Sequence, residues 1–455
     1  MAGCKEYAVT VKAKERVAAV LPVQEQRLPF SNLDLLLPAV NVGVFFCYKK
    51  LPAEQNPTTF ATTVSTLKTS LARALVTYHP FAGEVVTNSV GEPELLCNNR
   101  GVDFIEAYAN VELQELLFYN PDESVEGKLL PKVEEGVLCV QATELKCGGL
   151  VLACTFDHRI ADAYSANMFL VAWAETAASK TISLPPSFRR SLLTPRRSGS
   201  NDSSLDRLYV PVSSLPPMAP PPSPDQEAAV SRIYYIVADD IARIQVAAGG
   251  QRTKIEAFTA YLWRVLSRTA RPEDKVCRMA GVVDGRSRLA PGGEMAGYFG
   301  NVLSFPYGSL GVDELKDMDL EEVAEVVHGW LRPAATEEHF RGLVDWVEAL
   351  RPEPAVPRIY LRFKEGGLGC LVSSGRRFPV GEVEFGWGRA VFASYYLPLD
   401  SPTGYVMPMP SAKGNGDWVV YMHLLKSFLE LLEAEEPPVF RPLTADYFLA
   451  VAKRT

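Results

Sequence analysis

The stretch "GVLCVQATELKCGGLVLACTFDHRIADAYSANMFLVAWAETAAS", residues 136–179, places two strand patterns directly before a helix pattern. Its first half has two apolar runs joined through Cys147, Gly148 and Gly149, which predicts two strands connected by a tight turn. From Asp162 onward, small and apolar residues follow at helical spacing, and Asp162 stands where a helix N-cap belongs. The stretch therefore predicts a fold that mixes strands and helices.

A histidine and an aspartate, His158 and Asp162, lie in the break between the second strand and the helix. With 5 histidines in the chain, an H-x-x-x-D pair arises by chance in about one chain in four, so the pair alone is weak evidence. Its position strengthens it, because α/β proteins place their chemistry at the carboxyl ends of strands. Histidine is also suited to accepting a proton near neutral pH. Because Asp162 is expected to cap the helix, we do not expect it to relay protons to His158.

The chain is long enough for two domains. Its 455 residues exceed what one hydrophobic core usually supports, and both halves mix strand and helix patterns. Between them, "PRRSGSNDSSLDRLYVPVSSLPPMAPPPSPDQ" is rich in Pro and Ser, which is typical of an extended, exposed linker. We therefore predict an α/β fold with one domain over 1–195, a linker over 196–228 and a second domain over 229–455.

Charge and motifs exclude several classes of protein. A formal net charge of -8 argues against a broad nucleic-acid-binding surface, and no apolar run reaches the length of a membrane span. With no signal-peptide pattern at the N-terminus, we expect a cytoplasmic protein. There is no phosphate-binding G-x-x-x-x-G-K-[ST], no H-E-x-x-H and no G-x-S-x-G. We expect no metal site, buried free thiols for most of the 8 cysteines, and structural or surface roles for His79, His328, His339 and His423.

A second motif, "EFGWG" at Glu384–Gly388, follows the first at a separation that is much more specific than either motif alone. The two together resemble the signatures H-x-x-x-D and D-F-G-W-G of the plant BAHD acyltransferase family. The resemblance extends through "LPFSNLDLLLP", "YHPFAGEV", "VDGRSRLAP", "YFGN" and "SSGRRFPVGEVEFGWG". The phrases "SNLDLLLP", "GVFFCYK", "GEPELLCNNRGVDF" and "FDHRIADAYSANMFLVAW" look most like the coniferyl alcohol acyltransferase branch.

The resemblance implies two chloramphenicol-acetyltransferase-like domains with a channel between them, in a monomer without a permanently bound cofactor. Acyl-CoA, a co-substrate, and the acceptor would enter from opposite mouths and meet at His158, the general base. Ser373 would donate to the tetrahedral oxyanion, with Trp387 as a second candidate. Asp162 would pair with an arginine, Arg288 or else Arg286.

The same resemblance implies further site residues. Coenzyme A would be bound by Thr253, Arg286, Arg288 and Asn301. The second motif would be architectural, through Glu384, Phe385, Gly386 and Gly388, so Glu384 in place of the family's Asp would be tolerated.

The acceptor pocket is expected to be apolar. Val42, Val44 and Phe46 alternate on one face of a predicted strand, at positions where relatives that esterify shikimate or quinate carry polar side chains. Three apolar side chains leave a polyol unsatisfied, at roughly 1–3 kcal/mol per unpaired hydroxyl. Gly375, where Trp is common, would open room for an aromatic ring, with Phe378 beside it.

These observations favour an aromatic alcohol such as coniferyl alcohol as acceptor, with acetyl or hydroxycinnamoyl as the acyl group. Three alternatives stay open. In the first, Val42, Val44 and Phe46 are ordinary core residues. In the second, the acceptor is shikimate, quinate or an amine, and Arg362 is the nearest match to the arginine of the relatives that esterify shikimate or quinate. In the third, the protein is a catalytically silent relative with a binding role. An amine acceptor would want an acidic residue in the pocket, and none is obvious.

Overall fold

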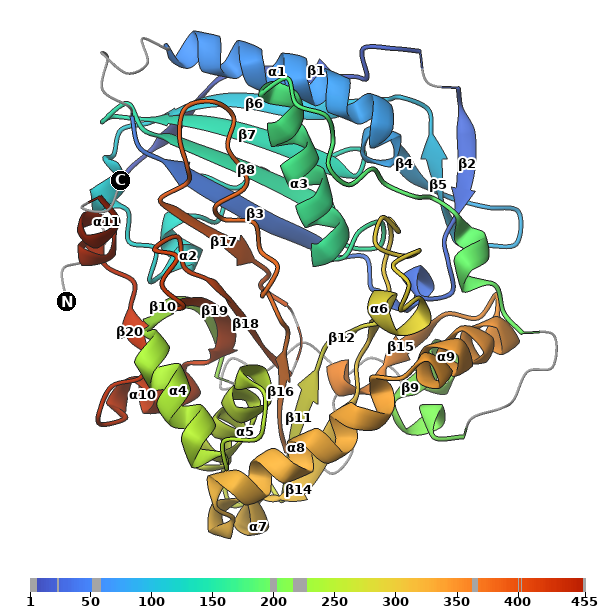
Figure 1. Cartoon of the computed structure of the whole chain (residues 1–455), viewed down its shortest axis with the longest axis vertical. Coiled ribbons are helices and arrows are strands. Elements are labelled where there is room, and N and C mark those ends of the chain that lie inside the picture. Colours follow the sequence, from blue (N-terminus) through green and yellow to red (C-terminus); the bar gives the residue numbers. More distant parts are fainter. Residues whose placement is uncertain are drawn as a thin grey trace.

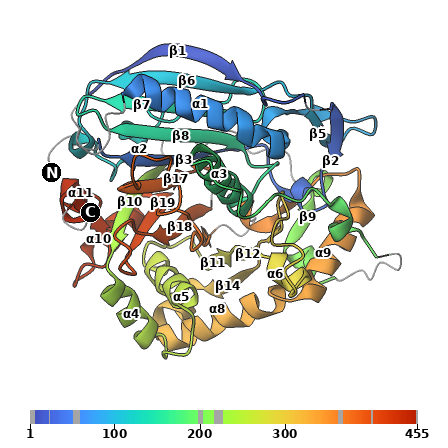
Figure 2. The same ribbon diagram turned by 45° about the horizontal axis from the view of Figure 1, so that its top comes forward.

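Two large sheets with their helices form the two halves of the molecule (Figures 1 and 2). This computed structural model describes residues 6–22, 24–50, 59–196, 203–215, 227–361, 367–399, 401 and 403–452. The α/β fold with mixed sheets that the sequence predicts is confirmed.

The first sheet is built mainly from the N-terminal half. Its strands, in spatial order, are β1 (Val9–Val17), β6 (Val102–Ala109), β7 (Leu138–Leu145), β8 (Leu150–Asp157), β3 (Asn41–Tyr48) and β17 (Phe392–Tyr396). Helices α1 (Phe60–Thr77) and α3 (Ala163–Ala177) pack against each other and lie over this sheet (Figure 1). Strand β8 is buried along its whole length, as expected for an apolar central strand covered on both faces. The predicted strand–strand–helix order over residues 136–179 is thus confirmed by β7, β8 and α3.

The second sheet has seven strands, all from the C-terminal half. Their order is β14 (Tyr307–Gly311), β11 (Val276–Gly281), β16 (Leu368–Val372), β18 (Gly404–Pro410), β19 (Trp418–Leu425), β10 (Ala229–Ile236) and β20 (Arg441–Pro442). A separate hydrophobic core joins this sheet to helices α4 (Ala238–Ala247), α5 (Lys254–Ser267), α7 (Val312–Asp317), α8 (Leu320–Ala334) and α10 (Lys426–Ala434).

Smaller elements fill the edges between the halves. Three short sheets pair β2 (Gln26–Pro29), β5 (Pro93–Cys97) and β4 (Glu84–Thr87); β12 (Val283–Asp284) and β13 (Leu303–Ser304); and β15 (Ala355–Pro357) and β9 (Tyr209–Pro211). The other helices are α2 (Pro121–Ser124), α6 (Arg286–Leu289), α9 (Glu337–Leu350) and α11 (Ala445–Ala452), with short 3-10 turns such as η1 (Asp34–Leu36) and η7 (Arg358–Tyr360).

One strand crosses from the second half of the sequence into the first sheet. Strand β17 pairs antiparallel with β3, from Phe392 opposite Cys47 to Tyr396 opposite Gly43, and Figure 1 shows the two side by side. One strand of the predicted second domain, 229–455, therefore lies in the sheet of the first half. Pattern reasoning missed the exchange because β17 resembles its neighbours in the sequence and nothing local says which sheet it joins.

The predicted linker is also partly folded. Residues 197–202 and 216–226 lie outside the described residues, but 203–215 form short turns and β9, which pairs with β15. Leu205 and Tyr209 in this segment are fully buried. The prediction of an extended, exposed linker is wrong for 203–215, because two apolar anchors among the Pro and Ser residues suffice to pack it.

The prediction of buried free thiols holds for most cysteines; Cys4 lies outside the described residues. Among those described, Cys147 is an exposed free thiol, and six are buried free thiols: Cys47, Cys97, Cys139, Cys154, Cys277 and Cys370.

Candidate active site

The turn that carries His158 begins where β8 ends. Asp157 stabilises the turn by two hydrogen bonds. Its carboxylate accepts one from the Arg159 backbone N–H at 2.9 Å, and its backbone carbonyl accepts one from the Ile160 N–H at 3.2 Å. The His158 backbone N–H donates to the Val40 carbonyl at 2.9 Å, which ties the turn to the segment before β3. The imidazole Nδ1 is fully buried and has no hydrogen-bond partner among the described residues. The fold thus fixes the backbone of His158 and leaves this ring nitrogen without a protein partner among the described residues.

Asp162 serves the fold and makes no hydrogen bond to the imidazole among the described contacts. Its carboxylate caps α3 by accepting from the Ser165 backbone at 2.9 Å, and it accepts from Arg286 at 2.7 and 3.1 Å. Both side chains are almost fully buried, at 1% and 3% exposure. Burial opposes the charge on Arg286, but Asp162 and Asp284 outweigh it and raise its pKa. The expectation of no relay agrees with this geometry.

The identity of the arginine partner needs a correction. Arg288, named first from the sequence, is not the partner of Asp162; Arg286 is. In the short helix α6 the two residues face different ways, and Arg288 is exposed in the wall of a cavity.

Asn301, predicted to bind coenzyme A, lies behind the His158 turn instead. It is fully buried, and its amide donates to the His158 and Arg159 carbonyls at 3.0 Å each. The same amide donates to Asp34 at 3.0 Å, and Asp34 also accepts from the Asn301 backbone at 2.6 Å. The side chain does not reach the cavity lining. Asn301 and Asp34 therefore hold the His158 turn in place, and Asp34 is a supporting residue that sequence reasoning missed.

A cavity of about 1270 Å³ runs between the two halves, with His158, Asp162 and Ser373 in its wall. This volume exceeds the roughly 300–1,000 Å³ of ordinary small-molecule pockets, so it suits two substrates at once. Strand β18 lines it from Tyr405 to Pro410, about 17 Å of extended chain. At the start of β18, the Thr403 hydroxyl donates to the Ile359 carbonyl in η7. At the other end of β18, Pro410 lies opposite Trp418, which packs edge-on against Phe258 of α5 with ring centroids 5.4 Å apart. The cavity thus has two distinct ends.

The end near η7 is mainly apolar, although the Tyr360 and Ser401 side chains also line it. It is lined by side chains from the segment around η1, from β15 and η7, and from the segment that leads into β18. We call these residues the apolar end: Leu37, Pro38, Val40, Val356, Leu361 and Leu399.

The other end carries positive charge. Its lining includes Lys254 at the start of α5, Arg288 on α6, and Arg376 and Arg377 after β16, which we call the cationic end. None of these four side chains has a carboxylate partner in the part of the chain that the structure describes. Arg377 lies over the Tyr164 ring at 5.1 Å. Unpaired cations in the wall of a protein with net charge -8 favour an anionic ligand.

Thr253 lies where a ligand at the cationic end would meet it. It caps α5, and its hydroxyl donates to Glu256 at 2.6 Å. Burial opposes ionisation of Glu256, but hydrogen bonds from Thr253 and His328 outweigh it and lower its pKa. His328 lies 2.7 Å from Glu256 and lines the cavity, a position that its charged helical surroundings did not reveal.

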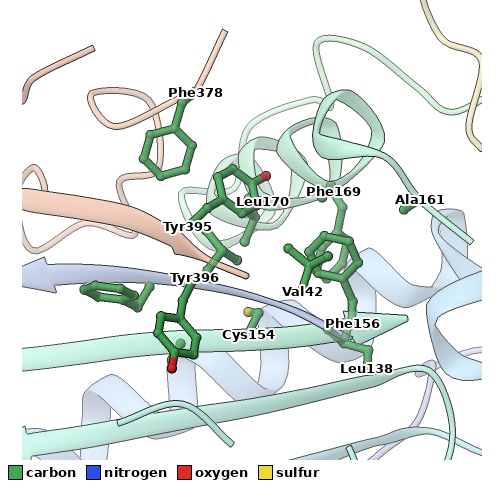
Figure 3. Close-up of a cluster of buried hydrophobic side chains, with 14 of the residues drawn as sticks. Val42, Leu138, Cys154, Phe156, Ala161, Phe169, Leu170, Phe378, Tyr395 and Tyr396 are labelled. Atoms are coloured by element: carbon green, nitrogen blue, oxygen red, sulfur yellow. The ribbon is translucent and has the colours of Figure 1, made fainter. Parts of the chain in front are cut away.

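Of the predicted acceptor residues on β3, only Val42 reaches a cavity. It lines a small space of about 20 Å³ beside His158, with Phe156, Tyr395, Tyr405 and Met407 among its neighbours. Figure 3 shows Val42 next to Phe156, the residue of β8 that lies opposite it in the sheet.

Val44 and Phe46 are core residues, each 1% exposed, and line neither cavity. Phe46 stacks on Phe378 at 5.4 Å. Phe378 packs on Tyr395 at 5.2 Å, so Phe378 is also core (Figure 3). The prediction that all of these side chains contact the acceptor is wrong, because most of this face of β3 packs against the loop before β17. The alternative of ordinary core holds for Val44 and Phe46.

Gly375 does not open the cavity either. A Cβ atom at this position would lie 2.5 Å from the Met409 side chain and 2.7 Å from the Pro408 carbonyl, and the Gly375 N–H donates to that carbonyl at 2.9 Å. The space that a larger residue would take is filled by β18. The expectation of extra room for a ring is therefore wrong.

The EFGWG segment forms a packed loop outside the cavity wall. Phe385 contacts Trp173 of α3 edge-on at 5.0 Å and stacks on Trp387, which in turn meets Tyr48 of β3. Gly386 and Gly388 have φ values of +101° and +95°, a conformation that favours glycine. Trp387 is thus not brought to His158, which removes it as an oxyanion donor. The Glu384 side chain is exposed, so its extra methylene has room.

Ser373 is the predicted oxyanion donor that the fold does bring to the cavity. Its backbone N–H donates to Val406 at 2.8 Å, which fixes it beside β18. Its side chain neighbours the hydroxyl of Tyr405, a residue that sequence reasoning missed, and opposes the burial that raises the pKa of that phenol. His158, Ser373 and Tyr405 share one wall of the cavity.

Two features are absent from the described residues. No helix among them is long and apolar enough to cross a membrane. No three of their His, Cys, Asp or Glu side chains are grouped as a metal site requires. Arg362, the arginine considered for a polyol acceptor, lies outside the described residues.

Comparison with known proteins covers nearly the whole chain. The family described as "Transferase family" matches residues 7–437. A hydroxycinnamoyltransferase of Narcissus pseudonarcissus is 28% identical over 436 residues, 91% of this chain and 96% of the relative. A (Z)-3-hexen-1-ol acetyltransferase of Arabidopsis thaliana is 28% identical, covering 94% of each.

Solved structures share the fold. Vinorine synthase superimposes with a TM-score of 0.68 and 21% identity, over 95% of this chain and 99% of that one. The TRI101 protein of F. graminearum, complexed with coenzyme A and deoxynivalenol, gives a TM-score of 0.73 at 14% identity, over 91% and 99% of the two chains.

Proposed function

Because the chain belongs to the BAHD family of acyl-CoA-dependent acyltransferases, we propose that it transfers an acyl group from coenzyme A to the hydroxyl of an apolar, aromatic alcohol such as coniferyl alcohol. His158 is the general base of this reaction. One observation carries the proposal: His158 lies in the wall of a cavity whose two ends differ in charge. The curated relatives transfer hydroxycinnamoyl or acetyl groups, so either acyl group is compatible with this proposal.

The cationic end is assigned to coenzyme A. The phosphates of the co-substrate are polyanionic, and Lys254, Arg288, Arg376 and Arg377 offer donors that form no salt bridge among the described residues. Thr253 and the start of α5 add the positive end of a helix dipole. A structural neighbour solved with coenzyme A shares this fold, which supports the assignment.

The reaction proceeds in a ternary complex. The imidazole of His158 removes the proton of the alcohol as its oxygen attacks the thioester carbonyl carbon. The carbonyl oxygen becomes negative and accepts a hydrogen bond from the Ser373 hydroxyl. When the tetrahedral intermediate collapses, the carbon–sulfur bond breaks and the imidazolium returns the proton to the coenzyme A thiolate. Asp162, committed to Arg286 and to the α3 cap, keeps the turn rigid.

The apolar end is assigned to the acceptor. Its aliphatic side chains suit an aromatic ring, and with Tyr360 and Ser401 as its hydroxyl groups it offers few partners for the hydroxyls of a polyol and no carboxylate for an ammonium group. A second candidate is an acidic acceptor such as shikimate, because Arg376 and Arg377 are arginines in the cavity wall that the sequence patterns did not reveal. A relative from Nicotiana tabacum that is 26% identical is a shikimate O-hydroxycinnamoyltransferase.

An acceptor screen tests the proposal. Acetyl-CoA and p-coumaroyl-CoA are each offered with coniferyl alcohol, a long-chain alcohol, shikimate and an amine, and free thiol release is followed. Turnover with coniferyl alcohol and none with shikimate is expected. Turnover with shikimate alone would favour the second candidate, and no transfer from either thioester to any acceptor would contradict the proposal.

A further inference from the structure

Tyr405 places a buried hydroxyl beside the predicted oxyanion donor. It lines the main cavity together with His158 and Ser373, and it lines the small space beside His158 as well. Only 7% of the residue is exposed, and burial raises the pKa of its phenol to about 12. The phenol therefore keeps its proton at neutral pH and can act as a hydrogen-bond donor.

Strand geometry explains why these side chains meet. Strands β16 and β18 run parallel, with Val372 opposite Val406. Those two valines belong to the core of the second half, while Tyr405 and Met407, their alternates on β18, belong to the core facing the first half. Side chains alternate along a strand, so Ser373, the residue after Val372, points to the opposite face from Val372. That is the face on which Tyr405 lies. Ser373 is the first residue after β16, and its N–H hydrogen bond to the Val406 carbonyl at 2.8 Å continues the register that brings the two side chains to one face.

The acceptor of the Tyr405 proton is a weak one. The hydroxyl donates to the Met407 Sδ at 3.4 Å, and the Ser373 side chain lies beside it. A thioether is a poor acceptor, whereas most buried hydroxyl groups find an oxygen or nitrogen partner. The O–H of Tyr405 therefore gives up only a weak hydrogen bond when it turns away from the sulfur.

We propose that Tyr405 is a positioning residue that acts through Ser373. When the Ser373 O–H turns to the oxygen of the tetrahedral intermediate, the Tyr405 O–H turns from Met407 to the Ser373 oxygen. Two successive hydrogen bonds polarise each other, so the Ser373 donor becomes stronger as negative charge develops. Only two hydroxyl protons move. This inference rests on the proposed acyl transfer and on Ser373 as its oxyanion donor.

A double-mutant cycle on kcat tests the inference, with the thioester and acceptor that turn over fastest in the screen. Tyr405→Phe keeps the ring and removes the hydroxyl. We expect it to lower kcat about tenfold with both KM values within about twofold, and Ser373→Ala to lower kcat about 10²-fold. The double variant should be no slower than Ser373→Ala alone, because Tyr405 has no route to the oxyanion without Ser373. Ser373→Thr, which keeps the hydroxyl, should retain the Tyr405 effect.

Tyr421→Phe is the matched control. This tyrosine lies on β19 with its ring centroid 6.3 Å from that of Tyr405, and its hydroxyl is paired with Ser231 away from the cavity lining. The Tyr421→Phe variant also loses a buried hydroxyl, but it should keep the wild-type kcat.

Three outcomes would overturn the inference. Wild-type kcat in Tyr405→Phe, or a tenfold loss that multiplies in full with that of Ser373→Ala, would show that Tyr405 does not act through Ser373, while the proposed acyl transfer would stand. Undiminished kcat in Ser373→Ala would remove the oxyanion assignment and this inference with it. A screen without any turnover would reject the proposed function itself.

Discussion

The two ends of the cavity are built in opposite ways. At the cationic end, Lys254, Arg288, Arg376 and Arg377 come from three separate segments and share positive charge without carboxylate partners among the described residues. At the apolar end, aliphatic side chains such as Val356, Leu361 and Leu399 leave few groups that satisfy a charge. His158 lies in the wall common to both. The difference assigns the polyanionic substrate to one end and the apolar substrate to the other, and each assignment can be broken separately.

The largest expected effect concerns the turn on which both ends depend. Asp162→Asn leaves the Arg286 guanidinium buried without its charge partner, a change that destabilises proteins by about 3–5 kcal/mol. Urea unfolding should show this loss. Asp284→Asn is the matched control, because Asp284 pairs with the same arginine but its side chain is 37% exposed, so its loss should be below about 1 kcal/mol. Equal losses in the two variants would contradict the assignment of Asp162 as the main partner.

The cationic end is tested by removing two charges. Arg376→Ala combined with Arg377→Ala should raise the KM for acyl-CoA about 30-fold, since hydrogen bonds to charged groups contribute about 1.5–3 kcal/mol. The KM for the alcohol and kcat should change little, and the sensitivity of the acyl-CoA KM to salt should fall. Arg389→Ala, an exposed arginine on the same loop outside the cavity lining, should leave the acyl-CoA KM unchanged. A rise in the alcohol KM instead would place the acceptor at this end.

The apolar end is tested by a single polar group. Leu399→Asn puts an amide without partners against the acceptor, and the KM for the alcohol should rise about fivefold while that for acyl-CoA stays constant. Leu399→Met keeps the volume and apolar character, so it should bind the alcohol as the wild type does. An unchanged alcohol KM in the Asn variant would remove Leu399 from the acceptor site.

The smallest effect is a pH dependence of stability through His423, which lies on β19 opposite Tyr405 and does not line the cavity. Burial lowers the pKa of His423 below 6.5, against the opposing effects of Asp122 and Glu126, and its Nδ1 lies 3.0 Å from the Ser231 hydroxyl. Below about pH 6.5 His423 is protonated in the unfolded chain but stays neutral in the folded chain. The free energy of unfolding should therefore fall as the pH drops below about 6.5. Urea midpoints at about pH 7.5 and 5.5 should differ less in His423→Asn. Burial also lowers the pKa of His79, so part of the slope should remain; an unchanged slope would contradict the role of His423.

The sequence predicts the centre of the site better than its ends. The order β7, β8 and α3 and the cap at Asp162 are local, and they follow from two apolar runs, a break and a small-residue helix. The distinction between Arg286 and Arg288 is not local, because it depends on which way a four-residue helix turns its side chains.

The ends depend on contacts between distant segments. Gly375 suggests free space until Met409 and Pro408 of β18 are seen to fill it. Val44 and Phe46 have the alternation of cavity residues, but the face of β3 that they occupy is covered by the loop before β17. Tyr405 stands out only when the register of β16 and β18 is known, since no motif marks it.

The central claim is that His158 is the base where the two substrates meet, and the kcat of His158→Ala tests it most directly. The variant should bind acyl-CoA as the wild type does, because the cationic end is intact, while kcat falls by at least about 10²-fold, the usual contribution of a general base. His79→Asn, a change outside the cavity wall, should keep the wild-type kcat. A His158→Ala protein that turns over at the wild-type rate would contradict the account.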